Sequence, residues 1–353
     1  MKDIINLELL TDIVKTPGAP GYESCIRNRV IEEIKDLVDE WYIDHIGNLI
    51  CIKKGSKNPD GKKLMYAAHL DEISFMVTHI DDAGFLKFHT LGGFDPKTLT
   101  SMRVIVHGKE DLPGVMGCKP IHIMSPEERT KAPKISDFYI DLGLSKEEVE
   151  KVVSVGDTIT RKQEIIQMGN LINGKSFDNR LSVYILIETL KQLEEIPYDL
   201  YAVFTVQEEV GLRGASVASH AINPDFGIAI DVTIANDTPG VPGHEKVTEL
   251  GKGTAVKIFD ASTICDYRMV DFLKKTATES TITWQSEILT AGGTDTAGIQ
   301  RMGKNGAIAG ALSIPLRYVH QVIETAHPED IKATIDLLVK ASEKVDTYNW
   351  EHK

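Results

Sequence analysis

The period of the hydrophobic pattern changes along the chain. Near the start, apolar residues recur at helical spacing over 2–15 and 22–40, on either side of a Pro- and Gly-rich loop at 17–21. Short apolar runs follow at 49–52 and 63–68. Runs of this length are typical of buried strands. The pattern therefore predicts two helices followed by two strands.

The predicted elements become shorter in the middle of the chain. From about 73 to 165, strand-like segments at 75–80, 85–90 and 103–106 are joined by turn signals such as Asp81-Asp-Ala-Gly84. Strands separated by turns about every eight to twelve residues are typical of a small barrel or sandwich. The charged, helix-prone segment 125–152 is expected to be a surface excursion from that barrel.

Strands and helices alternate after about residue 170. The pattern predicts helices at 178–193, 214–222, 266–277 and 328–348, and strands at 200–206, 226–230, 282–289 and 307–312. This alternation indicates an α/β fold with a mainly parallel sheet flanked by helices. We expect one discontinuous domain built from 1–71 and 168–353, with a β-rich barrel or sandwich domain inserted at 72–167.

Length and composition agree with two domains. A chain of 353 residues exceeds what one hydrophobic core usually supports. The net charge of −13 argues against nonspecific binding to nucleic acid or to an anionic membrane. No apolar run reaches transmembrane length, and acids interrupt the apolar N-terminal pattern, so neither a membrane span nor a signal peptide is predicted. Four widely spaced cysteines favour free thiols in a reducing cytoplasm.

Two adjacent carboxylates, Glu208 and Glu209, follow the predicted buried strand at 200–206. Like charges at the mouth of a buried strand repel each other and resist desolvation. A fold tolerates them where a cation is bound or where one acid transfers protons. The other Glu-Glu pairs, at 32–33, 147–148 and 194–195, are ordinary solvated pairs, so the setting at a strand end distinguishes this one.

Other polar residues follow predicted strands in the same way. Ligands of a covered α/β sheet bind outside the carboxyl ends of its strands. The residues there are two histidines and five carboxylates: His69, Asp71, Asp178, Glu208, Glu209, Asp231 and His320. Five acids at one sheet edge would be strongly repulsive without positive charge, whereas one or two divalent metals would make the arrangement favourable.

Each of these residues also has an ordinary interpretation when it is taken alone. His69 and Asp71 are two apart in an extended chain and face the same way, so Asp71 can orient the imidazole for a metal, or the two can be an incidental pair. Asp178 could simply cap a helix N-terminus. Asp231 could be an ordinary acidic residue of a loop, and His320 a histidine whose hydrogen-bonding groups are satisfied within the fold. Their common position at strand ends favours the metal site.

Several motifs resemble the M42 metallo-aminopeptidases, relatives of the TET peptidases, in order along nearly the whole chain. They are Ala68-His-Leu-Asp-Glu72, the segment 114–122, Ser176-Phe-Asp-Asn-Arg180, the segments 205–215 and 230–242, Gly292-Gly-Thr-Asp-Thr296 and Pro315-Leu-Arg-Tyr-Val-His320. The resemblance implies a zinc-peptidase-like catalytic domain and an inserted domain for dimerisation and oligomerisation. It further implies a dodecamer built from dimers.

The resemblance also implies a role for each site residue. His69, Asp178 and Asp231 would hold one metal, and Asp178, Glu209 and His320 the other, with Asp178 bridging. Glu208 matches the general base of the family, and Asp71 the residue that orients the first histidine. Two positions depart from the family pattern: Asn179 stands where members commonly have Asp, and Ser74 where they often have Gly.

The expected reaction is hydrolysis of the N-terminal residue from short peptides. Two metals that share a water lower its pKa. Glu208 would take the proton of this water and pass it to the leaving amine. One metal would hold the free α-amine of the substrate, which restricts cleavage to N-terminal residues. The imidazole and carboxylate ligands suit zinc or cobalt, with manganese a further option.

Other functions use the same features differently. A metal-dependent deacylase could use the same scaffold without requiring a free amine. A glycoside hydrolase (relatives have carried cellulase labels) would use paired carboxylates without metal in a cleft lined with aromatic residues. However, no tryptophan lies near the proposed site in the sequence. A non-enzymatic scaffold would neither bind metal nor hydrolyse peptides.

Two shorter signals are weaker. The loop 292–298 could line a substrate pocket or form a tight turn into a helix. The pair His244-Glu245 lacks a second histidine at zincin spacing, so a solvated loop is expected there.

Overall fold

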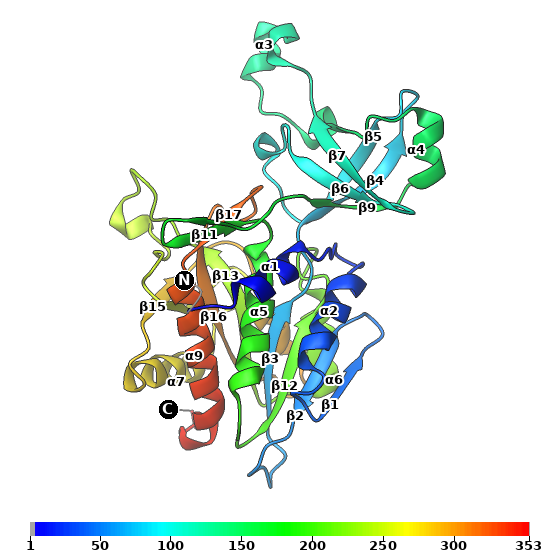
Figure 1. Cartoon of the computed structure of the whole chain (residues 1–353). Helices are drawn as coiled ribbons and strands as arrows, with labels where there is room; N and C mark the ends of the chain where they lie inside the picture. Colours follow the sequence, from blue (N-terminus) through cyan, green and yellow to red (C-terminus); the bar gives the residue numbers. More distant parts are fainter. Residues whose placement is uncertain (1–3, 353) are drawn as a thin grey trace.

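The computed structural model describes residues 4–352 and contains a helix-flanked sheet with a closed barrel projecting from it (Figure 1). The chain enters the barrel directly after strand β3 (Lys63–His69) of the sheet. It leaves the barrel after β9 (Thr158–Arg161) and returns to the sheet at β10 (Ile166–Met168). The predicted boundary between 167 and 168 falls within this last strand.

The sheet has eleven strands among the described residues, and its centre is parallel. Strands β12, β3, β13 and β16 pair parallel, whereas antiparallel pairs extend the sheet on both sides. The main path is β1 (Glu40–Ile43), β2 (Leu49–Lys53), β12 (Asp199–Thr205), β3, β13 (Phe226–Ile234), β16 (Ile308–Arg317), β17 (Glu324–Ala326), β11 (Leu171–Gly174) and β10. Strand β14 (Thr254–Phe259) branches from β16 and pairs parallel with β15 (Trp284–Ile288).

Helices cover both faces of the sheet, as the alternation of elements predicts. Alternate residues of the buried β3 point to opposite faces: Tyr66 joins one hydrophobic cluster and Met65 the other. The first face is covered by α1 (Leu7–Lys15), α2 (Ser24–Ile34), α5 (Phe177–Gln192), α7 (Tyr267–Glu279) and α9 (Pro328–Lys344), and the second by α6 (Arg213–Ile222) and α8 (Thr296–Met302). The sheet is therefore buried, and mainly its strand ends are available for a site.

The barrel closes around its own hydrophobic core. Its strands, in order, are β4 (Ser74–Ile80), β5 (Leu86–Leu91), β8 (Tyr139–Asp141), β7 (Asp111–Gly117), β6 (Arg103–His107) and β9. Phe75 lies at the centre of this core, with its ring centroid 4.3 Å from that of Phe94 and 5.1 Å from that of Phe88. The predicted barrel-or-sandwich is thus a six-stranded barrel.

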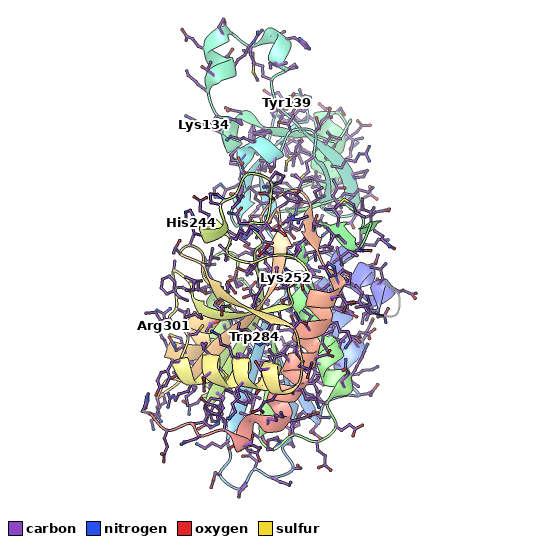
Figure 2. The ribbon with its side chains drawn as sticks, turned by 90° about the vertical axis from the view of Figure 1, so that its left-hand side faces the viewer. Lys134, Tyr139, His244, Lys252, Trp284 and Arg301 are labelled. Carbon is purple, nitrogen blue, oxygen red and sulfur yellow. The ribbon has the colours of Figure 1, made fainter. Side chains whose placement is uncertain are left out.

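The prediction that all of 125–152 is a surface excursion is wrong. Only the part before Ile135 projects from the barrel, including α3 (Pro126–Thr130) (Figures 1 and 2). The chain then returns as β8, and α4 (Lys146–Val152) packs on the barrel through the buried Val149. β8 has only three residues, which is too short for strand alternation to be visible in the sequence.

Several element boundaries also differ from the predicted ones. The helix predicted at 22–40 ends at Ile34, and β1 begins at Glu40. The helix predicted at 2–15 begins at Leu7, after Asn6 accepts a hydrogen bond from the backbone of Leu9; residues 2–3 lie outside the described residues. Strands β10, β11, β14 and β17 were not predicted, because most are short and their sequences are mixed.

All four cysteines are free, as expected from their spacing. In the part of the chain that the structure describes, no helix has both the length and the apolar character needed to cross a membrane.

Candidate active site

The polar residues predicted at strand ends meet at the carboxyl edge of the parallel strands. His69 is the last residue of β3, and Glu208 and Glu209 follow β12 after a short turn. Asp231 lies within β13, which continues to Ile234 rather than ending at 230 as predicted. The pairing of β13 with β3 stops at Ala229, opposite Ala67, so Asp231 lies just beyond the paired part, about level with His69.

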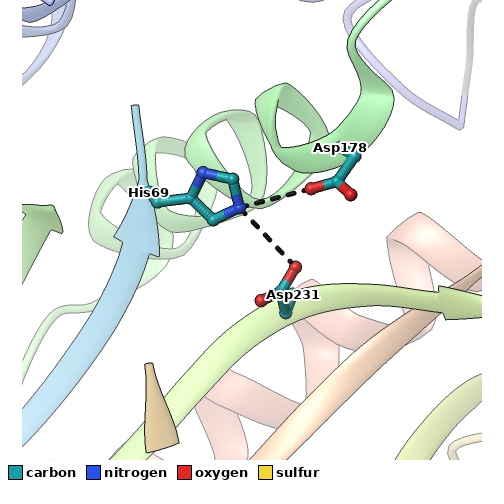
Figure 3. Close-up of side chains that lie close together, drawn as sticks. All are labelled: His69, Asp178 and Asp231. Atoms are coloured by element: carbon teal, nitrogen blue, oxygen red, sulfur yellow. Dashed lines mark ion pairs between the residues drawn. The ribbon is translucent and has the colours of Figure 1, made fainter. Parts of the chain in front are cut away.

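One ring nitrogen of His69 faces two carboxylates from different elements (Figure 3). Its Nε2 atom is 3.2 Å from Oδ1 of Asp178, in the first turn of α5, and 3.9 Å from Oδ1 of Asp231. One ligand atom from each of these three buried residues lies within 4.8 Å of the others. Helix α5 and strands β3 and β13 thus bring together three potential metal ligands.

A second group shares Asp178 with the first. Oδ2 of Asp178 is 3.1 Å from Nε2 of His320, and this same imidazole nitrogen is 3.5 Å from Oε2 of Glu209. The ligand atoms of these three residues also lie within 4.8 Å of one another. The two oxygens of one carboxylate therefore face two different histidines.

Asp71 orders the backbone that carries the glutamate pair. Its carboxylate accepts hydrogen bonds from the backbone N–H groups of Glu208, at 3.0 Å, and of Glu209, at 3.1 Å. Nδ1 of His69 is 3.0 Å from the backbone carbonyl oxygen of Asp71 and 3.5 Å from its carboxylate. Asp71 therefore contacts His69 more closely through its backbone carbonyl than through its carboxylate, and in addition it holds the glutamate turn, which the sequence did not indicate.

The start of α5 departs from regular helix at the site. Asp178 and Asn179 have non-helical backbone angles, and the Asp178–Asn179 peptide bond is cis. Ser176 is the N-cap residue, so Asp178 is not the capping residue that its position also suggested. The side-chain amide of Asn179 donates to the carbonyl oxygen of Ile230 at 3.0 Å, which ties α5 to β13 next to Asp231.

Burial sets the charge state of these groups. Burial raises the pKa of Glu209 to about 8, with the Asp178 carboxylate adding to the effect, and raises the pKa of Asp231 to about 7. Burial also raises the pKa of Glu208 well above its usual range. Burial opposes protonation of His320, but its contact with Asp178 raises the pKa of this imidazole to about 10. Despite its burial, contacts with the acids also raise the pKa of His69, so the two histidines offset part of the negative charge, but the acids outnumber them.

The donor set fits divalent cations. Each group offers one imidazole nitrogen and two carboxylates, ligand types that suit zinc, cobalt or manganese. Oε1 of Glu209 is buried and has no hydrogen-bond partner among the described residues, so it is a polar atom that a cation would satisfy. Glu208 belongs to neither group, although its Oε2 atom is 3.9 Å from Nε2 of His69.

An open cavity of about 930 Å³ gives access to these residues. Its walls beyond the charged edge are largely apolar and include Leu212, Ile234 and Leu289. Residues 292–294 line the cavity, and α8 begins directly afterwards at Thr296, so both interpretations of that loop hold. His244 lies in an exposed turn away from the cavity, as expected (Figure 2).

Four buried charged residues around the site were not predicted. Lys257 lines the cavity and pairs with Glu287 at 2.7 Å. Asp295 accepts a hydrogen bond from the Thr205 hydroxyl at 2.5 Å. Arg161 and Glu324 lie beside the segments that carry Asp178 and His320. Only Asp295 belongs to a segment that the sequence had singled out, the loop 292–298, and no pattern marked the other three.

A covered α/β sheet whose carboxyl edge gathers histidines and carboxylates is the arrangement of a metal-dependent hydrolase. Comparison with known proteins gives the family. The model of the M42 glutamyl aminopeptidase family matches residues 47–337. The chain therefore belongs to the M42 family, whose members are named as aminopeptidases, metal-dependent hydrolases that act on peptide bonds.

Relatives match over nearly their whole length. The lysyl aminopeptidase of Pyrococcus furiosus is 36% identical over 347 residues, covering 95% of this chain and 96% of the relative. The aminopeptidase APDkam598 of Desulfurococcus kamchatkensis has a TM-score of 0.92 at 38% identity, covering 97% and 95% of the two chains. The TET1 peptidase of Pyrococcus horikoshii, which can assemble into a tetrahedron or a large octahedral shell, has a TM-score of 0.84 at 33% identity, covering 95% and 98%.

Proposed function

We propose that this protein is a two-metal aminopeptidase that removes the N-terminal residue from short peptides. The observation that carries the proposal is the position of Asp178, whose two carboxylate oxygens face His69 and His320 at 3.2 and 3.1 Å. A carboxylate shared in this way by two sets of ligand atoms is suited to bridge two cations.

In this proposal His69, Asp178 and Asp231 hold one cation, and Asp178, Glu209 and His320 hold the other. Zinc or cobalt suits these ligands best, and manganese is the further option. When bound, the cations supply Lewis-acid chemistry: they lower the pKa of a water and polarise the scissile carbonyl.

Glu208 is the proposed general base. Its side chain is buried, lies outside both ligand groups, and has a pKa raised well above its usual range by burial. A carboxylate with a raised pKa accepts a proton from an attacking water more readily than an ordinary one. Glu208 then passes that proton to the leaving amine. The backbone N–H groups of Glu208 and Glu209 donate hydrogen bonds to Asp71, which keeps the Glu208 side chain in place.

We assign the catalytic domain to 1–71 and 168–353, and a role in dimerisation and oligomerisation to the inserted barrel of 72–167. A dodecamer built from dimers is the proposed assembly, in line with the closed shells of the TET1 relative. Enclosed sites would admit short peptides and exclude folded proteins. The free cysteines accord with a reducing compartment, so we place the protein in the cytoplasm.

The proposal is tested with a panel of aminoacyl-anilides and their N-acetylated counterparts. Activity should be lost when metals are stripped by a chelator and restored by zinc, cobalt or manganese, each added alone. Substrates with a free amine should be cleaved and acetylated ones should not. Cleavage of the acetylated substrates would instead identify a deacylase, and polysaccharide hydrolysis that survives the chelator would identify a glycoside hydrolase.

A further inference from the structure

We propose that Arg161 and Glu324 are a pair of positioning residues that hold Asp178 and His320 in place for the second cation. Neither residue belongs to a ligand group, and neither lines the cavity. The inference rests on the proposed function, because it assigns a task to residues that surround the proposed metal site. It also gives the barrel a part in that site, since Arg161 belongs to β9.

Glu324 connects the two ligand-bearing segments through its carboxylate. Oε2 accepts a hydrogen bond from the backbone N–H of Asp178 at 3.0 Å, and Oε1 accepts one from the backbone N–H of His320 at 3.3 Å. Its side chain is fully buried in β17. One carboxylate thus fixes the distance between the backbones of two proposed ligands that are far apart in the sequence.

Arg161 makes a second connection between the same two segments. Its Nη1 atom donates to the carbonyl oxygen of Gln321 at 2.5 Å, and its Nη2 atom donates to the hydroxyl of Ser176 at 2.9 Å. Gln321 follows His320, and Ser176 lies two residues before Asp178. Arg161 is almost completely buried, and its charge lies close enough to Glu324 to oppose the effect of burial on the pKa of that carboxyl.

The backbone of these segments explains why two connections are needed. Ser176 and His320 have φ angles of 54° and 59°. These lie in the left-handed region, which residues other than glycine rarely adopt. Such conformations persist only where the surrounding structure holds them. His320 is also partly exposed, with 42% of its side chain accessible, so packing alone does not fix its imidazole. Without the pair, we expect His320 to lose its fixed position opposite Asp178.

The experiment measures metal binding directly, by titrating the metal-free protein with Co²⁺ in a calorimeter and recording the visible absorption of the bound cobalt. Glu324→Gln replaces one acceptor oxygen with an amide N–H group, which would then face a backbone N–H. We expect the wild type to bind two equivalents. In Glu324→Gln the affinity of one of the two sites should fall by about 10- to 100-fold, the usual effect of losing a group that orients a ligand, and its cobalt spectrum should change.

Asp330→Asn is the matched control. Asp330 is also a fully buried carboxylate, and it accepts hydrogen bonds from the backbone N–H groups of Gly251 and Gly253 at 2.8 and 2.7 Å. Neither glycine lines the cavity. This variant should lose stability in thermal unfolding but keep both cobalt affinities and the wild-type spectrum. A loss of affinity in Glu324→Gln no larger than in Asp330→Asn would reduce Glu324 to a structural residue and overturn the proposal.

Arg161→Lys is a second variant that keeps the positive charge but replaces the planar guanidinium with a single nitrogen, which cannot occupy the positions of both Nη1 and Nη2. It should weaken the same cobalt site, so the proposal can be tested even where Glu324→Gln does not fold. Two unaltered sites in folded Arg161→Lys would contradict the role of Arg161. A wild-type protein that binds fewer than two equivalents would instead refute the proposed function, and the inference with it.

Discussion

Two clusters of buried charged residues lie next to each other in this protein. They differ in how the negative charge of their carboxylates is offset. In the first, which we call the Glu72 cluster, the Glu72 carboxylate is 2.6 Å from Nζ of Lys175 and 3.4 Å from Nη2 of Arg180. Burial would raise the pKa of Glu72, but the positive charges of Lys175, Arg180 and Arg161 lower it to about 2. The second is the cluster of the candidate active site, where burial raises the pKa of Glu209 to about 8.

The difference lies in the source of positive charge. The Glu72 cluster is neutralised by basic side chains of the chain itself, and it joins α5 to the segment between β3 and β4. In the cavity, the described residues include one lysine, Lys257, which is paired with Glu287. Two histidines, His69 and His320, offset only part of the charge of the acids there, so the candidate active site has to obtain the rest of its counter-charge from outside. The first cluster is structural, and the second is suited to bind metal.

The largest expected effect concerns the base. Glu208→Gln removes the group proposed to accept the proton while leaving both ligand groups intact. We expect kcat on an aminoacyl-anilide to fall by about 10²- to 10⁴-fold, the usual contribution of a general base, with two metal equivalents retained by elemental analysis. Undiminished turnover would show that another group takes the proton.

Breaking the Glu72 cluster should affect stability instead of catalytic chemistry. Glu72→Gln leaves Lys175 and Arg180 buried without their counter-charge. Removing one partner of a buried ion pair costs about 3–5 kcal/mol in free energy of unfolding, which urea denaturation of the metal-free protein measures. Glu188→Gln is the control, because its partly exposed pair with Lys191 should contribute only about 0–1 kcal/mol. Equal losses in the two variants would remove the distinction between buried and surface pairs.

The Glu72 cluster should also sensitise the protein to acid. The pKa of Glu72 falls from 4.5 in the unfolded chain to about 2 in the fold, so its contribution is present above pH 4.5 and is lost as pH falls through 2. This shift corresponds to about 3 kcal/mol at most. Between pH 4.5 and 2, the free energy of unfolding should therefore fall more steeply in the wild type than in Glu72→Gln. Parallel curves would contradict the lowered pKa.

The smallest expected effect is a change in the free energy of unfolding at Glu209. Its sign is opposite to the change expected for Glu72→Gln. Glu209→Gln removes one of several buried acids whose charge the two histidines offset only in part, so it should raise the free energy of unfolding of the metal-free protein by on the order of 1 kcal/mol. With metal present, the same variant should bind one equivalent less and lose the stabilisation that this cation gives. A destabilised metal-free Glu209→Gln protein would mean that this acid is already satisfied by the fold.

The sequence predicted the α/β core and most of the site because both depend on local pattern. Strand and helix periods are visible over a few residues, and the carboxyl ends of parallel strands have to meet at one edge. His69, Glu208 and Glu209 could therefore be placed from the strands before them. Strand β8 and the early end of the helix predicted at 22–40 could not, since short elements are defined by their partners rather than by their own sequence.

The sequence by itself determined which ligand types the protein offers and on which elements they stand. Only the tertiary structure decided that Asp178 faces two histidines, that Asp71 holds the backbone of both glutamates, and that Arg161 and Glu324 surround the site. These contacts join residues that are far apart in the chain. Hydrogen bonds and ion pairs act over only a few ångströms, so which of the many polar residues meet depends on how the elements pack.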